Sequence, residues 1–408
     1  MLLNYQFANF CSFEDETAFS MKPGRLMDRF EDNMMRFENG AKVLKSAVIV
    51  GENAGGKTNF IQSIQFLQSL FNTNDPVSSV KKLVNFNARI QENTRQSFAI
   101  EVVIPDAKGE QTIYRYTLDM DEDLVLEESL SYKQRYAGEY REAFSVTYRK
   151  EEISRNSGIK EVNASYHGRF DKGLLEQEIF GRAITGAQGL AVTSLALIEP
   201  KVVRPFVNWF TDTLLVESPD YGSIDMYKGL KREERDIDIL RQDSFLEIFS
   251  LIDETITGIE IDEDAPYKDS IIIRDTCDNQ CMRTELKEES SGIREYFAWA
   301  LQIWKVVYED KVLFADEVDR VLNPILAQKI VAYVHGTEHR GQFIFTTHNI
   351  LHLNTIDFMK QQLWFVAKHR KNLNSEMYSL ADFPEFRYDK VNIYDWYLKG
   401  ILGGAVND

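Results

Sequence analysis

Eight consecutive residues early in the chain have the types and the spacing that bind phosphate. They read Gly-Glu-Asn-Ala-Gly-Gly-Lys-Thr over positions 51–58. Glycines let backbone N–H groups curl around phosphate oxygens, and a helix that begins at the end of the loop adds a favourable dipole. In such a loop Lys57 reaches the β- and γ-phosphates, and the Thr58 hydroxyl binds Mg²⁺. We expect ATP to be bound by Gly51, Asn53, Gly55, Gly56, Lys57, Thr58 and Asn59.

Two adjacent carboxylates follow a short apolar run much later in the sequence. Residues 312–315 read Val-Leu-Phe-Ala, and Asp316 and Glu317 come directly after them. A buried parallel strand delivers such residues to the carboxyl edge of its sheet, where α/β proteins bind ligands. We expect Asp316 to hold Mg²⁺, directly or through water, and Glu317 to orient or deprotonate the attacking water. Together with the phosphate loop, this pair predicts a Mg²⁺-dependent ATP hydrolase.

Two further segments contain residues suited to sensing a γ-phosphate. Ser290, Ser291 and Gly292 stand at the start of a predicted helix. Serine is a common helix cap, but the position shortly before the carboxylates favours a second role. The hydroxyls, the Gly292 N–H and the helix dipole would bind a γ-phosphate presented by another subunit. His348 ends the apolar run 343–347, where one class of ATPases places a γ-phosphate-sensing histidine, so we give it a catalytic role.

The elements that must position these residues predict an α/β core that is split in the sequence. A short apolar run precedes the phosphate loop, and apolar residues at helical spacing follow it. Near the end of the chain, helix and strand patterns alternate, which is typical of a parallel sheet. The predicted strands cover 43–50, 312–315 and 342–346, and the predicted helices cover 58–71, 293–307 and 324–333.

The residues between the two halves change character twice. Four segments rich in β-branched and aromatic residues predict an antiparallel β lobe. From about position 172 the period becomes helical, with expected helices at 206–215 and 240–256, before a hairpin of 270–274 with 282–286. We therefore predict an N-terminal ATPase lobe over 1–154, a mostly helical insertion over 155–265 and a C-terminal ATPase lobe over 266–408. The four predicted strands of the β lobe are 97–104, 112–120, 125–133 and 143–150.

Acidic residues outnumber basic ones, 64 against 47, which gives a formal net charge of −17. This balance argues against a protein that covers duplex DNA with a large basic surface. Much of the acidity lies in 217–269, which is either a solvated surface or a docking face for a basic partner. The chain has no run of ~20 apolar residues for a membrane span and no signal-peptide pattern. With three cysteines, a reducing cytoplasm is the expected location.

In this order, the four motifs resemble those of ABC-type ATPases of the SMC, RecF and OLD-like branch. Residues 316–319, Asp-Glu-Val-Asp, look like the SMC form of the carboxylate strand. The closer match is to AAA-type ATP-binding proteins of bacterial abortive-infection and restriction-linked loci, the AbiL- and RloA-like proteins. That match rests on Gly-Glu-Asn-Ala at 51–54, Glu-Ser-Ser-Gly at 289–292 and the tail over 362–405.

The resemblance implies an ABC-ATPase-like head that works as a pair. Each ATP would lie between the phosphate loop of one subunit and residues 290–292 of the other, in a head-to-tail homodimer. OLD-type relatives carry a Toprim nuclease behind the ATPase. Here only about 60 residues follow His348, and none form an Asp-x-Asp pair, so a nuclease would be a separate protein.

Three hypotheses for function follow. The first is a nucleotide-driven sensor or scaffold that controls a separately encoded toxic effector, a nuclease, in anti-phage defence. The second is a RecF/SMC-like ATPase that acts directly on DNA in repair. The third is a slowly hydrolysing scaffold locked by ATP. The acidic charge and the lack of a sustained heptad repeat for SMC-type arms favour the first.

Overall fold

The computed structural model describes residues 1–24, 28–72, 83–106, 108–121, 124–148, 164–168, 189–198, 201–217, 234–275, 280–353, 355–388 and 392–402. Within these ranges, none of the helices is long and apolar enough to cross a membrane.

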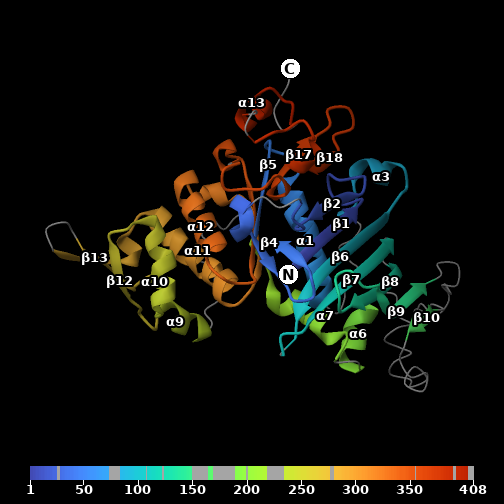
Figure 1. Cartoon of the computed structure of the whole chain (residues 1–408), viewed down its shortest axis with the longest axis horizontal. Helices are drawn as coiled ribbons and strands as arrows, with labels where there is room; N and C mark the ends of the chain where they lie inside the picture. Colours follow the sequence, from blue (N-terminus) through green and yellow to red (C-terminus); the bar gives the residue numbers. More distant parts are fainter. Residues whose placement is uncertain are drawn as a thin grey trace.

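A six-stranded sheet forms the centre of the molecule (Figure 1). All neighbouring strands in it are parallel except the last pair. Every residue of its three central strands is buried, which explains why they read as continuous apolar runs. The predicted split α/β core is thus confirmed. In sheet order the strands are β11 (Leu214–Glu217), β15 (Val312–Ala315), β16 (Gln342–Thr347), β5 (Ser46–Gly51), β17 (Leu363–Lys368) and β18 (Ser375–Ser379).

Alternate side chains of the central strands enter two separate cores. Ile49 and Phe314 pack into one core together with helix α1 (Lys57–Asn72). Val48 and Leu313 face the opposite core, which contains α11 (Ser291–Tyr308) and α12 (Pro324–Gly336). The strands are therefore covered on both faces, and their carboxyl ends form one fixed edge.

A seven-stranded antiparallel sheet lies beside the central sheet (Figure 1). Its four middle strands match the predicted β lobe closely. The N-terminal strand pair joins this sheet, and the aromatic rings of Phe7 and Phe60 meet between it and α1. In order the strands are β10 (Ala164–Gly168), β9 (Arg141–Tyr148), β8 (Leu124–Lys133), β7 (Gln111–Asp121), β6 (Arg95–Pro105), β1 (Leu2–Ala8) and β2 (Thr17–Ser20).

The predicted helical insertion differs from expectation in its described part. The expected helix over 206–215 ends early, and its last residues form β11, because the run Leu-Leu-Val pairs with the buried strand β15. The expected helix over 240–256 is broken into α9 (Glu234–Leu240), α10 (Asp243–Phe249) and η5 (Ser250–Ile252). One strand of the insertion thus belongs to the central sheet, and the three-part division of the chain stays a prediction.

A small third sheet completes the fold next to α10 (Figure 1). The predicted hairpin is present, and one more strand pairs with it. The sheet consists of β12 (Ile256–Glu260), β13 (Ile271–Asp275) and β14 (Cys281–Glu285). The remaining elements are η1 (Asp28–Asn33), β3 (Met34–Arg36), β4 (Lys42–Leu44), α3 (Phe86–Ile90), α6 (Ala191–Ile198), α7 (Arg204–Asn208), η4 (Trp209–Thr213), η6 (Leu286–Glu288), η7 (Val318–Arg320), η8 (Ile350–His352), η9 (Lys360–Gln362), η10 (Leu380–Asp382) and α13 (Ile393–Leu398).

Glu128 on β8 connects the antiparallel sheet to the start of α6. Its buried carboxylate accepts hydrogen bonds from the Tyr116 hydroxyl at 2.9 Å, from the Ala191 N–H at 2.6 Å and from the Val192 N–H at 3.0 Å. Burial raises the pKa of Glu128 to about 7, and the three donors act against that increase. The group is therefore a buried acid whose protonation state differs between the folded and the unfolded chain.

We expect the contribution of Glu128 to stability to fall as the pH rises from about 4.5 to about 7. In that window the folded chain keeps a proton that the unfolded chain, with the ordinary pKa of 4.5, has released. The full effect is about 3 kcal/mol. Thermal melting at about pH 5 and about pH 8 measures it, and the wild type should lose more stability than Glu128→Gln. Glu127→Gln, an exposed neighbour on the same strand, should behave like the wild type. Parallel profiles for the wild type and Glu128→Gln would contradict the assignment.

Candidate nucleotide-binding site

Three neighbouring strands bring the predicted site residues to one edge of the central sheet. β5 leads into the phosphate loop, β15 ends at Asp316 and Glu317, and β16 ends at His348. Because β16 lies between the other two strands, His348 comes between Lys57 and Glu317. The sheet order thus assembles residues that are far apart in the sequence.

Lys57 is the centre of this arrangement. Its Nζ donates hydrogen bonds to the Gly51 carbonyl at 2.8 Å, to the Glu52 carbonyl at 2.9 Å and to His348 Nδ1 at 2.9 Å. Burial lowers the pKa of Lys57 to about 8, and Asp316, Asp319, Glu317 and Glu52 oppose that decrease. The ammonium group therefore stays charged at neutral pH, as a phosphate-binding lysine must.

The two predicted metal ligands, Thr58 and Asp316, meet in the folded chain. The Thr58 side chain hydrogen bonds with Asp316, and Thr346 Oγ1 donates to Asp316 Oδ1 at 2.6 Å. Burial raises the pKa of Asp316, and these hydrogen bonds oppose the increase. A hydroxyl and a carboxylate are oxygen ligands of the kind that Mg²⁺ prefers, so the residues present fit the ion.

Glu317 is held in an unusual backbone conformation. Its φ of 51° is left-handed, which is rare for a residue with a Cβ. The Glu317 N–H donates to Thr346 Oγ1 at 2.8 Å, so a single hydroxyl positions both carboxylate residues. Thr346 lay within the predicted strand, but its spacing gave no sign of this role.

His348 links the lysine to the second carboxylate. Since its Nδ1 accepts from Lys57, the proton of a neutral ring lies on Nε2, which is 3.4 Å from Glu317 Oε1. The His348 N–H donates to Asp319 Oδ1 at 3.2 Å. The predicted γ-phosphate sensor thus contacts both the phosphate-binding group and the predicted base.

The serine-glycine segment occupies the exposed start of helix α11. Ser290 is the N-cap and its Oγ accepts the Ile293 N–H at 3.3 Å, while Ser290 and Ser291 are exposed to solvent. A Cβ built on Gly292 would find its nearest neighbour, Ser290 Oγ, at 4.0 Å, so that side of the helix is open. The cap reading of Ser290 is correct, and it leaves Ser291 and Gly292 accessible to another molecule.

Part of the chain matches a known protein family. Residues 46–169 match the family model described as "AAA domain, putative AbiEii toxin, Type IV TA system". Over these residues the chain resembles an AAA-type ATPase domain. No curated protein matches the sequence.

Solved SMC head domains align with this chain over most of their length, at low sequence identity. The SMC head domain from Thermotoga maritima is 16% identical with a TM-score of 0.39, covering 93% of this chain and 98% of that one. An Smc head with an extended coiled coil, bound to the C-terminal domain of ScpA from Pyrococcus furiosus, is 13% identical with a TM-score of 0.40, covering 98% and 99%. An SmcHead bound to the C-winged helix domain of ScpA is 13% identical with a TM-score of 0.42, covering 93% and 97%.

The backbone of the predicted phosphate loop requires glycine at two positions. A Cβ on Gly51 would lie 2.3 Å from the Val366 carbonyl oxygen of β17. Gly56 has a φ of 121°, and a Cβ there would lie 2.4 Å from Ser375 Oγ. Asn53 is exposed on the loop. Its predicted contact with nucleotide stays a prediction, as do the nucleotide contacts predicted for the other residues of the loop.

Two serines that the motifs did not reveal, Ser12 and Ser375, form hydrogen bonds around the phosphate loop. Ser375 Oγ donates to the Gly55 carbonyl at 2.6 Å and lies 2.7 Å from Ser12 Oγ, whose hydroxyl can donate to it. The Asn59 amide also donates to Ser12 Oγ, at 2.8 Å. The three side chains come from the two ends of the chain and from α1, so no local pattern could have linked them.

An ion-pair network fixes the residue before the helix cap. Arg274 on β13 binds Glu289 through two hydrogen bonds of 2.5 and 3.0 Å, and its Nε lies 3.1 Å from Asp253. Both members of the first pair are largely buried. Two-point binding restricts orientation more than a single contact does. The small third sheet thereby positions the start of α11.

Proposed function

We propose that this ATPase is a Mg²⁺-dependent switch that controls a separately encoded toxic effector, a nuclease, in anti-phage defence in the cytoplasm. The observation that carries the proposal is the convergence of Lys57, Thr58, Asp316, Glu317 and His348 at one sheet edge, in a chain whose first part matches a family described by a toxin and a type IV toxin–antitoxin system. A hydrolase site supplies the switch, and the family description supports the defence role.

In the proposed site each group has one task. Lys57 and the loop N–H groups hold the phosphates, while Thr58 and Asp316 supply oxygen ligands for Mg²⁺, which would neutralise phosphate charge. Glu317 orients or deprotonates the attacking water. His348, which contacts Glu317 on one side and Lys57 on the other, reports the presence of the γ-phosphate.

The proposed site is completed by a second copy of the chain. The hydrogen bond accepted by Ser290 Oγ comes from within its own helix, and Ser290 and Ser291 are exposed. A helix N-terminus with free hydroxyl groups is suited to bind an anion from outside. In a twofold head-to-tail dimer, residues 290–292 of one subunit would contact the γ-phosphate held by the other. ATP binding would then join the heads, and hydrolysis would release them.

The effector is proposed to dock on the acidic segment 217–269, of which residues 218–233 lie outside the described part. Several of its described carboxylates are paired within the chain: Glu254 with Lys329, Glu260 with Arg283, and Glu263 with Arg241. Exposed pairs of this kind contribute little and can exchange partners. A basic partner would compete for them, and its binding would weaken as salt rises.

Co-expression with the neighbouring gene tests this proposal. Cells that carry the ATPase and its neighbour should be protected from phage, and cells with Lys57→Ala or without the neighbour should not. The two proteins should also co-purify at low salt. Protection that survives Lys57→Ala would show that the ATP cycle is not the switch. Tight DNA binding with DNA-stimulated turnover and no co-purifying protein would favour direct action on DNA instead.

A further inference from the structure

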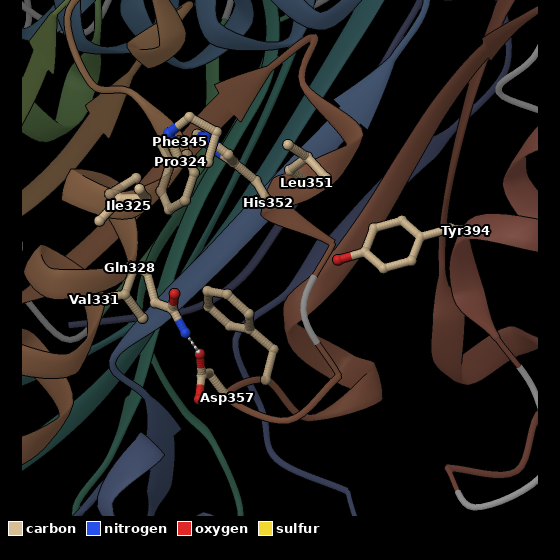
Figure 2. A pocket seen from close by; sticks show the side chains of 11 residues that line it. Pro324, Ile325, Gln328, Val331, Phe345, Leu351, His352, Asp357 and Tyr394 are labelled. Carbon is tan, nitrogen blue, oxygen red and sulfur yellow. Dashed lines mark hydrogen bonds between the residues drawn. The ribbon is translucent and has the colours of Figure 1, made fainter.

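A cavity of about 240 Å³ lies behind the two loops that carry the catalytic residues (Figure 2). One wall is the first part of α12, and another is η8, which begins just after His348 and Asn349. Figure 2 shows Tyr394 on the far side, with its hydroxyl directed inward. The apolar lining consists of Pro324, Ile325, Ala327, Val331, Phe345, Leu351 and Phe358.

His352 is the unusual member of this lining. It is 5% exposed, and neither of its ring nitrogens has a hydrogen-bond partner among the described residues. Its ring lies edge-on to Phe345, with the ring centres 5.9 Å apart. By contrast, the nearby polar pair is satisfied, because the Gln328 amide donates to Asp357 at 2.9 Å. Buried polar groups are nearly always paired, so an unpaired imidazole in a cavity wall points to a missing partner.

The size and chemistry of the cavity define that partner. An apolar cavity of about 150 Å³ can hold benzene, so this one has room for a fused two-ring system. Burial lowers the pKa of His352, which keeps the ring neutral, with one N–H donor and one acceptor nitrogen. A neutral flat heterocycle with its own N–H and ring nitrogen would satisfy either side of the imidazole and fill the apolar space.

We propose that this cavity is a binding site for a small neutral bicyclic heteroaromatic ligand, recognised by a hydrogen bond to His352. Two backbone loops connect the walls of this cavity to the predicted catalytic residues. The loop from Glu317 leads through Asp319, which bonds to the His348 N–H, into Pro324 at the cavity wall. The loop from His348 leads into His352. A ligand bound in the cavity would therefore contact both loops and restrict their movement.

Calorimetric titration with benzimidazole tests the site without any nucleotide. Benzothiophene, which has the same shape but no N–H, is the matched probe. Benzimidazole should bind at a single site, and His352→Phe, which keeps the ring volume, should weaken it about tenfold while changing benzothiophene binding by less than about twofold. Ile325→Arg, an exposed change at the mouth, should weaken both probes. Absence of saturable binding, or benzimidazole binding equal in wild type and His352→Phe, would overturn the proposal.

An effect of the cavity ligand on ATP binding rests on the proposed function, and it is measured separately. If the ligand holds the arrangement in which Lys57 contacts His348, benzimidazole should raise the Kd for ATP, and ATP should raise the Kd for benzimidazole by the same factor. Independent binding of the two would overturn the connection. A wild type that binds benzimidazole but does not hydrolyse ATP would refute the proposed function while leaving the cavity site intact.

Discussion

Replacing Lys57 with alanine is expected to abolish detectable ATP binding and to lower turnover at least about 100-fold. Lys57 is the cationic side chain held within the loop, on the carbonyls of Gly51 and Glu52. Without it, the phosphates would lose a positive charge that offsets four nearby carboxylates, those of Glu52, Asp316, Glu317 and Asp319. Fluorescent-nucleotide binding and phosphate release measure the two effects.

Lys329→Ala is the matched control for the loss of a lysine. Lys329 lies on α12 and pairs with Glu254 at the surface, so its removal should leave binding and turnover unchanged. A melting temperature measured for both variants separates a functional loss from unfolding. Normal ATP affinity and turnover in a folded Lys57→Ala protein would refute the assignment of the phosphate loop.

The exchange of Glu317 for glutamine should separate binding from hydrolysis. The amide keeps the shape of the side chain and its reach toward His348, but it cannot accept a proton from water. The left-handed backbone at this position is equally strained for both residues, so the fold should not distinguish them. We expect ATP binding to persist and turnover to fall about 100-fold or more.

If the site is shared between two chains, Glu317→Gln should accumulate as an ATP-dependent dimer. Light scattering with and without ATP measures the change in mass. Adding Gly292→Trp should prevent dimer formation while sparing binding by the single chain, because the glycine side of α11 is open. Gly336→Trp is the control, since a Cβ there meets nothing within 4 Å and the residue ends a different helix, α12. A Glu317→Gln protein whose mass ignores ATP would exclude the shared site.

Local sequence patterns were enough to predict the residues that are positioned by a single strand or a single turn. The run before the phosphate loop, the run before Asp316 and the run before His348 each became a fully buried strand of the central sheet. The chemical roles expected for the residues after these strands followed from the residue types and from the order of the motifs in the sequence. Thr58 and Asp316 then meet as a Mg²⁺ site requires, because parallel strands place their carboxyl ends at one edge.

The residues that the sequence did not reveal act through contacts between distant segments. Thr346 positions two carboxylates from a neighbouring strand, and Ser375 supports the phosphate loop from the opposite end of the chain. The expected helix over 206–215 was wrong at its end for the same reason, since pairing with β15 outweighs local helical spacing. Such contacts exist only once the sheet order is known.

The position of β5 has a consequence for how the protein is made. Both edges of this strand are covered by strands from the far end of the chain, with Phe343 opposite Ser46 and Leu363 opposite Val48. About 300 residues must therefore leave the ribosome before the first partner arrives, which takes about 15 to 60 seconds at ordinary rates of translation. During that time an apolar strand with two open edges is exposed to aggregation. Until those strands are made, β5 lacks its partners on both edges, and the phosphate loop lacks the hydrogen bond from Ser375.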